Sequence, residues 1–230
     1  MPPTTLKTHT DRQYDAQLDD LRARLVDMAR RVEEMIANSV RALVNRDAAL
    51  AKRTIEDDHQ VNRCEVEADE LCLLILAKRQ PMASDLRFIT LALKMVTDLE
   101  RIGDLAVNIC ERAIDLSSVP KVKPWEDIPG MAAIVRAMVR EAIDAFISRD
   151  AVKAQQVIEW DDEVDAQYRH VVLDVINVMI ADRSTVENGV MVQSVAKWLE
   201  RMADHATNIA EQVIFMVHGK DIRHLGKLPR

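Results

Sequence analysis

Two stretches about a hundred residues apart carry nearly the same sequence. "LERIGDLAVNIC" runs from Leu99 to Cys110, and "LERMADHATNIA" runs from Leu199 to Ala210. A second pair, "NRDAALAKRTIEDDHQVN" at 45–62 and "SRDAVKAQQVIEWDDEVD" at 148–165, aligns at an offset of 103 residues. The repeat covers most of each half, so the chain must fold as two copies of one structural unit.

The repeated unit has the pattern of long helices. Apolar residues fall three or four positions apart, as from Leu18 to Leu21 and Leu25, and the 230 residues include only 5 glycines and 7 prolines. We expect helices over about 14–45, 48–78, 83–117, 128–148, 151–181 and 185–217. The sequence therefore predicts an all-α fold of two tandem, pseudo-symmetric three-helix bundles with six long helices.

The clearest break in the chain is "SSVPKVKPWEDIPG" at 117–130, which contains three prolines and a glycine. We interpret it as a linker between the two copies, and we expect the polar residues 1–12 to precede the first helix. The predicted division is a first bundle at 1–118, a Pro-rich linker at 119–127, a second bundle at 128–218 and a C-terminal tail at 219–230.

The repeated stretch places oxygen-bearing side chains on one face of its helix. At about 100° per residue, these side chains fall within a narrow arc in each copy, opposite the apolar residues. The two sets are Glu100, Asp104, Asn108 and Glu111, and Glu200, Asp204, Asn208 and Glu211.

Such a ridge is either a solvated face or a cation site. Carboxylates four residues apart repel by about 0.2–0.5 kcal/mol per pair, and a purely structural face has no reason to keep that cost in both copies. Arg101 and Arg201 can relieve part of it through contacts with Asp104 and Asp204. A bound cation would relieve more, and oxygen ligands without a matching His or Cys set suit Mg, Mn, Fe or Zn.

The preceding helix of each copy offers further oxygen ligands. Side chains at positions i, i+4, i+7 and i+11 share a face there, and in an antiparallel bundle that face can meet the repeated ridge along one groove. These residues are Asp58, Asn62, Glu65 and Asp69 in the first half, and Asp161 and Asp165 in the second. A solvated charged face is the alternative for them.

Other functional classes find little support. "EDDH" at 56–59 has the Glu-x-x-His spacing of di-iron bundles, but the second copy has Asp162 where His59 stands. A Gly-rich phosphate loop, a GxSxG elbow and a Cys/His zinc pattern are all missing, so we do not expect an enzyme. A net charge of −7 without a basic stripe argues against nucleic acid as a partner.

The localisation expected from the sequence is cytoplasmic. "MPPTTLKTHT" at the start has no apolar segment of a signal peptide, and the longest apolar run, "LCLLILA" at 71–77, is too short to span a bilayer. The three cysteines lack CxxC spacing, which is typical of reduced thiols. We therefore expect no direct insertion into a membrane.

The two copies of E-R-x-x-D-x-A-x-N-I resemble the paired acidic motifs of the PhoU family. "HTDRQYDAQLDDLRARLVDM" at 9–28, "RQPMASDLR" at 79–87 and "HGKDIRHL" at 218–225 add to the resemblance, which covers nearly the whole chain. It implies a fold of two similar three-helix bundles in a cytoplasmic, often dimeric protein. It also implies metal ions at the acidic motifs.

By position, the resemblance implies metal ligands at Glu100, Asp104, Glu200 and Asp204. Asn108, Asn208, Asp58, Asp161 and Asp165 are the supporting candidates. The second half departs from the first at its turn, where "ADRSTVEN" lacks the features around Pro81, so the two sites are expected to differ.

The resemblance also implies a role in phosphate signalling. Such proteins act as negative regulators of the phosphate-starvation response and of high-affinity phosphate uptake. The implied partners are the ATP-binding subunit of the phosphate transporter, a sensor histidine kinase and a second copy of the chain. A metal-storage or di-iron-type carboxylate bundle is the alternative, and a purely structural scaffold is the third.

Overall fold

The computed structural model describes residues 9–118 and 127–219, and the regular elements in these ranges are all helical. The helices are α1 (His9–Asn45), α2 (Ala48–Arg79), α3 (Ala83–Leu116), α4 (Ile128–Ser148), α5 (Ala151–Ala181) and α6 (Val186–His218), with a short 3-10 helix, η2 (Arg183–Thr185), before α6. This confirms the predicted all-α class and its six long helices. The first helix begins at His9, five residues before the predicted start at Tyr14.

Two parts of the predicted division fall largely outside the described residues. The linker predicted at 119–127 overlaps the described chain only at Asp127, the residue preceding α4. The tail predicted at 219–230 overlaps it only at Gly219, which caps α6 in the left-handed conformation at φ 67°. The division at these positions stays a prediction.

The same two-residue turn joins the first two helices of each half. Arg46 and Arg149 adopt the left-handed conformation, with φ of 58° and 55°. The aspartate that follows each arginine caps the next helix: the Asp47 carboxylate accepts from the Leu50 N–H at 2.8 Å, and Asp150 accepts from the first-turn N–H groups of α5. The repeated "RD" pair therefore fixes where α2 and α5 begin.

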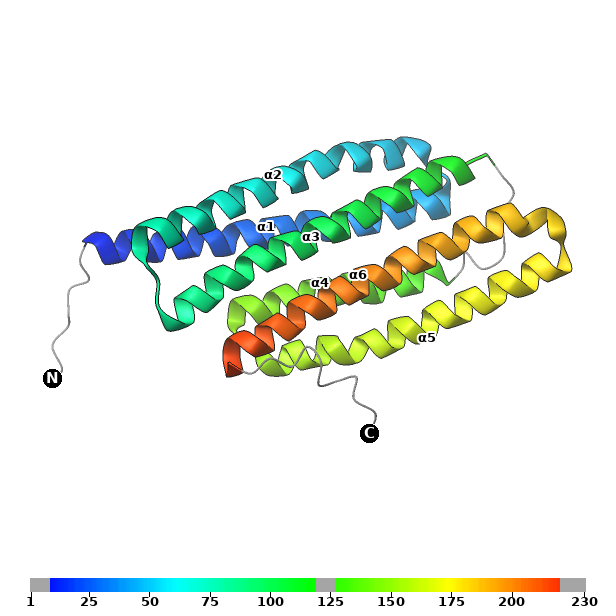
Figure 1. The fold of residues 1–230 in the computed structure, drawn as a ribbon. Helices are drawn as coiled ribbons and strands as arrows, with labels where there is room; N and C mark the ends of the chain where they lie inside the picture. Colours follow the sequence, from blue (N-terminus) through cyan, green and yellow to red (C-terminus); the bar gives the residue numbers. More distant parts are fainter. Residues whose placement is uncertain (1–8, 119–126, 220–230) are drawn as a thin grey trace.

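The six helices form two bundles that lie side by side (Figure 1). Helices α1, α2 and α3 pack against one another, and α4, α5 and α6 do the same. The halves meet where α3 packs on α6 and α1 packs on α4, which leaves α2 and α5 outermost. Buried apolar residues of both halves form one continuous core, in which Phe88 of α3 stacks on Phe146 of α4 with ring centroids 4.9 Å apart.

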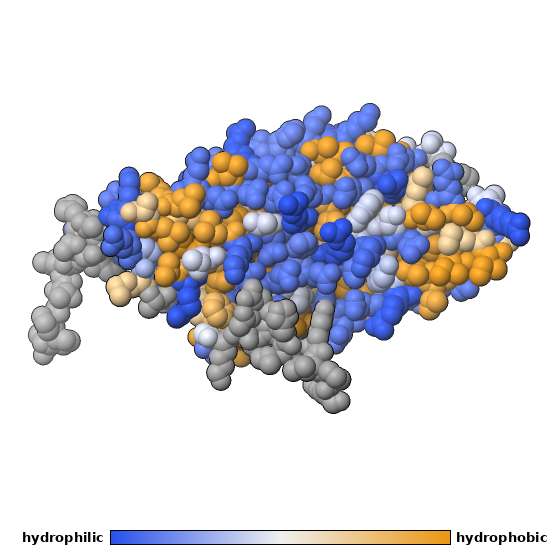
Figure 2. Space-filling model, viewed as in Figure 1, coloured by the Kyte–Doolittle hydropathy of each residue, from blue (hydrophilic) through white to orange (hydrophobic). Residues whose placement is uncertain are grey.

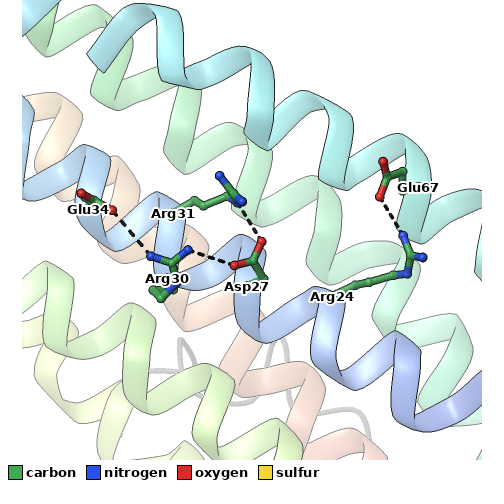
Figure 3. Close-up of polar contacts among 6 residues, drawn as sticks. All are labelled: Arg24, Asp27, Arg30, Arg31, Glu34 and Glu67. Atoms are coloured by element: carbon green, nitrogen blue, oxygen red, sulfur yellow. Dashed lines mark hydrogen bonds and ion pairs between the residues drawn. The ribbon is translucent and has the colours of Figure 1, made fainter. Parts of the chain in front are cut away.

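A charged network on the surface connects α1 to α2 (Figure 3). Arg24 Nη1 donates to Glu67 Oε2 across the two helices at 2.8 Å. On α1 itself, Arg30 and Arg31 both donate to the Asp27 carboxylate, at 3.0 and 2.8 Å. These ion pairs are largely exposed, so each contributes at most about 1 kcal/mol.

The two hairpin tips, where α2 meets α3 and α5 meets α6, lie at opposite ends of the molecule and expose apolar side chains. Figure 2 shows an apolar patch near each end. The exposed large apolar residues near the tips are Leu73, Leu74, Met82 and Leu86 in the first half, and Leu173, Ile176, Ile180, Val186 and Val190 in the second. Within the described ranges, no helix is both long enough and apolar enough to cross a membrane.

Candidate metal centre

The ridge of the first half lies on α3. Glu100 and Asp104 are partly buried, with side chains 17% and 42% exposed, and Asn108 is half-buried on the same face. Arg101 lies beside both carboxylates: its Nη1 donates to Asp104 Oδ2 at 3.1 Å, and its Nε lies 3.5 Å from Glu100 Oε2. One arginine therefore compensates part of the repulsion between two carboxylates.

Helix α2 brings its own oxygen ligands against this ridge. Asp58 lies close to α3, since a Cβ added to Gly103 would lie 3.5 Å from Asp58 Oδ1. A Cβ at this distance would be in ordinary van der Waals contact, so the Asp58 carboxylate packs directly against the α3 backbone at Gly103. Asn62 Nδ2 donates to the other oxygen of Asp58 at 2.8 Å. Asp58 of α2 therefore lies next to α3 beside Gly103, close enough to Asp104 for the two charges to interact.

Three oxygen atoms in this region are buried without a hydrogen-bond partner in the described structure. They are Asp58 Oδ1, Asn62 Oδ1 and Asp69 Oδ1, all on α2. A buried acceptor without a partner typically costs about 1–3 kcal/mol, and more when it is charged. Asp58 and Asn62 lie about one helical turn apart, so one cation can satisfy both of their oxygens, whereas Asp69 lies about three turns from Asp58.

The electrostatics of the first site point the same way. Burial raises the pKa of Asp58, and the Asp104 charge adds to that rise against the opposing Asn62 bond. Burial also raises the pKa of Glu100, with further contributions from Asp104 and Glu65. Burial, then the Asp69 charge, raises the pKa of Glu65. The carboxylates of α2 and α3 are therefore close enough to raise one another's pKa.

The second half repeats this arrangement with α5 and α6. Burial raises the pKa of Asp161 to about 6, and the charges of Asp204, Asp165, Asp162 and Glu200 add to the rise. Asp161, Asp165, Glu200 and Asp204 therefore form the counterpart of the first cluster. Asp204 and Asn208 are more exposed than Asp104 and Asn108, so the second ridge is more open to water.

A lysine makes the second cluster chemically different. Lys197 Nζ contacts both carboxylate oxygens of Glu200, at 2.6 and 2.5 Å, and lies 5.3 Å from the ring centroid of Tyr168. The matching residues of the first half are Thr97 and Glu65. Val172 likewise stands where the first half has Asp69. The second half thus has fewer carboxylates and a cation of its own.

One group of side chains with metal-ligand atoms lies away from both ridges. Ligand atoms of Asp127, His170 and Asp174 lie within 4.8 Å of one another, and these residues form the one such close group of three in the described ranges. The ridge carboxylates are spaced more widely. Asp127 and His170 are exposed, and exposed acidic groups are common without an ion. The Glu56 and His59 side chains of the di-iron alternative are both exposed on α2.

The seam between the halves holds a polar contact that the sequence analysis missed. His205 Nδ1 of α6 lies 2.9 Å from Asp98 Oδ1 of α3, and Gln212 Nε2 donates to Asp98 Oδ2 at 3.2 Å. The positions that match Asp98 and Gln212 in the other half are Trp198 and Arg112, whose guanidinium lies 5.6 Å from the Trp198 ring centroid. The two pairs occupy matched positions of the repeat but consist of different residue types. No sequence motif therefore marks them.

Comparison with known proteins decides the family. The family profile described as "PhoU domain" matches residues 25–113 and again residues 128–213, one match in each half of the chain. The chain belongs to the PhoU family. This confirms the resemblance that the paired motifs indicated, and the two matches contain both ridges.

Curated relatives within the PhoU family match over nearly the full length. The "Phosphate-specific transport system accessory protein PhoU homolog" of Pseudomonas aeruginosa is 39% identical over 223 residues, covering 96% of this chain and 92% of the relative. "Phosphate-specific transport system accessory protein PhoU" of Escherichia coli K12 is 34% identical over 226 residues, covering 98% and 94%.

Solved PhoU structures share the fold. The crystal structure of PhoU from Pseudomonas aeruginosa matches with a TM-score of 0.86 and 38% identity, covering 90% of this chain and all of that one. The "phosphate transport system regulatory protein PhoU" of Streptococcus pneumoniae matches with a TM-score of 0.84 and 26% identity, covering 90% and 98%. The paired bundles are therefore the architecture of the family.

Proposed function

We propose that this protein is a negative regulator of the phosphate-starvation response and of high-affinity phosphate uptake. It acts as a metal-binding helical adaptor between the phosphate ABC transporter and a sensor histidine kinase. Full-length similarity to proteins named as accessory or regulatory components of phosphate transport supports the regulatory role. Long helices with exposed apolar tips at both ends suit the binding of partner proteins without catalysis.

The observation that carries the metal-binding part is the set of buried, unpartnered oxygens on α2. Asp58 Oδ1 lies beside Gly103 of α3 and its carboxyl interacts with the Asp104 charge, while Asn62 Oδ1 lies on the side chain that donates to Asp58. Carboxylate and amide oxygens are ligands for hard cations such as Mg²⁺, Mn²⁺ or iron, and carboxylates also bind Zn²⁺. The residues present therefore fit such an ion, and its charge would offset the carboxylate repulsion between α2 and α3.

Genetic removal of the protein tests the regulatory role. A strain without the gene should express a phosphate-starvation reporter in phosphate-rich medium, and the wild-type gene should restore repression. A reporter that stays repressed in the deletion strain would overturn the proposed role.

A second complementation separates the metal ridges from the scaffold. We expect the variant Glu100→Gln, Asp104→Asn, Glu200→Gln and Asp204→Asn to fold, to bind less metal by elemental analysis and to restore repression poorly. A control with four exposed acids changed to amides, at Glu34, Glu56, Glu159 and Glu163, should restore repression fully. Equal metal content in the two variants would remove the metal from the proposal.

A further inference from the structure

Two clefts lie along the seam between α1 and α4. The first, which we name the Arg41 cleft, has a volume of about 350 Å³ and lies between the end of α1 and the start of α4 around Arg41 and Arg136. The second, the Arg30 cleft, has a volume of about 430 Å³ and lies around Arg22, Arg30 and Ile147. The 103-residue offset relates Val44 in the first cleft to Ile147 in the second, so the clefts are counterparts.

The arginines of the Arg30 cleft have acidic partners. Arg30 donates to Asp27 Oδ1 at 3.0 Å and lies 3.7 Å from Glu34 Oε2, as Figure 3 shows. Arg22 donates to Asp19 Oδ1 at 2.6 Å. The positive charge at this end of the seam is therefore compensated within the protein.

The arginines of the Arg41 cleft have no such partners. Arg41 Nη2 donates to the neutral Asn38 Oδ1 at 2.8 Å. Neither Arg41 nor Arg136 forms an ion pair within 4.0 Å with any residue in 9–118 or 127–219. Burial raises the pKa of Glu33, and the charges of Arg140 and Arg136 oppose that rise. Glu33 is therefore an acid whose charge interacts with Arg136 at longer range. Two exposed guanidinium groups thus border one cleft in a chain of net charge −7.

The rest of the Arg41 cleft is mainly apolar. Val40 and Val44 of α1 face Ala132 and Ala133 of α4, and the volume lies in the range of small-molecule sites. Guanidinium groups bind phosphate oxygens through paired N–H donors, and a phosphomonoester carries close to two negative charges at neutral pH. A carboxylate carries one negative charge and would therefore neutralise only one of the two arginines.

We propose that the Arg41 cleft binds a small organic phosphate. Arg41 and Arg136 hold the phosphate group at the opening, and the apolar body of the ligand packs on the valine and alanine side chains. The site is separate from the acidic ridges, which lie on α3 and α6, so it stands or falls independently of metal binding.

Titration of phenyl phosphate into the full chain, followed by calorimetry or NMR, tests the proposal. We expect saturable binding that weakens about tenfold or more in Arg41→Gln/Arg136→Gln, because two charged hydrogen-bond donors are lost. The matched control, Arg22→Gln/Arg30→Gln, removes two charges from the Arg30 cleft and should bind like wild type. Unsaturable binding to wild type, or equal weakening in both variants, would overturn the site.

Three further arms test the ligand class. Ala133→Leu keeps both arginines but fills the cleft, and it should also abolish binding of phenyl phosphate. Benzoate should bind more weakly because it carries one charge, and inorganic phosphate should bind more weakly because it lacks the apolar body. Benzoate binding as tightly as phenyl phosphate would refute the choice of phosphate. Tight binding of inorganic phosphate, or full binding by Ala133→Leu, would refute the apolar contact.

Discussion

Asp161 lies on α5, where burial and then the charges of the neighbouring α6 ridge residues Asp204 and Glu200 raise its pKa. Its pKa of about 6 lies above the ordinary value of 3.8, mainly through burial and then through neighbouring carboxylates. A carboxyl whose pKa is raised by folding contributes stability that is present below its unfolded pKa and is lost as the pH rises through its folded pKa. The charged form of Asp161 therefore weakens the metal-free protein above about pH 6.

We predict that Asp161→Asn stabilises the metal-free protein at neutral pH. After allowance for solvent screening of this half-buried group, the gain is about 1 kcal/mol, or roughly 2–4 °C in Tm. The gain should disappear as the pH falls toward 4, where Asp161 is protonated. Thermal unfolding in chelator at several pH values measures it, with the exposed Glu163→Gln as the control. A gain independent of pH would contradict the electrostatic cause.

At the scale of single elements, the sequence predicted most of the structure. Apolar spacing and the repeated "RD" turn placed five of the six helices within about a residue of their observed ends. The start of α1 was missed because residues 9–13 are polar and lack the apolar spacing that marks a helix. The difference between the two ridges was expected, but its cause, the contact of Lys197 with Glu200, depends on side-chain positions that no motif records.

The contact of Lys197 with Glu200 predicts unequal metal affinity. If the proposed site is correct, Glu100→Gln/Asp104→Asn should weaken Mn²⁺ binding, measured by electron paramagnetic resonance, by about tenfold or more, because two of the proposed anionic ligands are removed beside the unpartnered oxygens of α2. Glu200→Gln/Asp204→Asn should have the smaller effect, since a lysine already neutralises Glu200. A larger effect of the Glu200→Gln/Asp204→Asn variant would show that the bound metal displaces Lys197 from Glu200.

The packing of α5 against α6 depends on Gly189. A Cβ at this position would lie 2.8 Å from Met179 Cγ and 3.2 Å from Val175 Cγ1. We predict that Gly189→Val destabilises the protein by about 1–3 kcal/mol, measured by urea unfolding. Gly130→Ala is the control, because its nearest atom is Gln167 Oε1 at 4.0 Å, and it should be neutral or slightly stabilising. Equal changes in the free energy of unfolding for the two variants would mean that α5 and α6 can move apart enough to accommodate the larger side chain.

At the scale of the whole molecule, the halves are joined by a continuous core and by a polar seam. Asp98 is the acceptor for groups of α6, and its side chain is only 14% exposed. Sequence periodicity identified the buried face of each helix, but it carries no information about which residue of one half meets which residue of the other. The pairing of Asp98 with His205 is therefore a property of the assembled fold alone.

We predict that Asp98→Ala lowers the free energy of unfolding by about 1–3 kcal/mol, because polar groups of His205 and Gln212 lose their partner in a largely buried position. Unfolding should remain a single transition, with circular dichroism and tryptophan fluorescence coinciding, since the core is continuous. Asp19→Ala, which removes an exposed carboxylate, should cost at most about 0.5 kcal/mol. Two separate transitions would show that the seam couples the halves weakly.

The matched positions at the seam have a consequence for how the molecule diverged. A dimer of identical single bundles must present the same pair of residues on both sides of its axis. Covalent fusion of the two copies lifts that restriction, so Asp98 with Gln212 and Trp198 with Arg112 occupy positions that symmetry would otherwise force to be alike. The matched positions of the two clefts and of the two ridges are likewise free to differ. Each half of the chain can therefore carry its own side chains at matched positions while the helices of both halves pack in the same way.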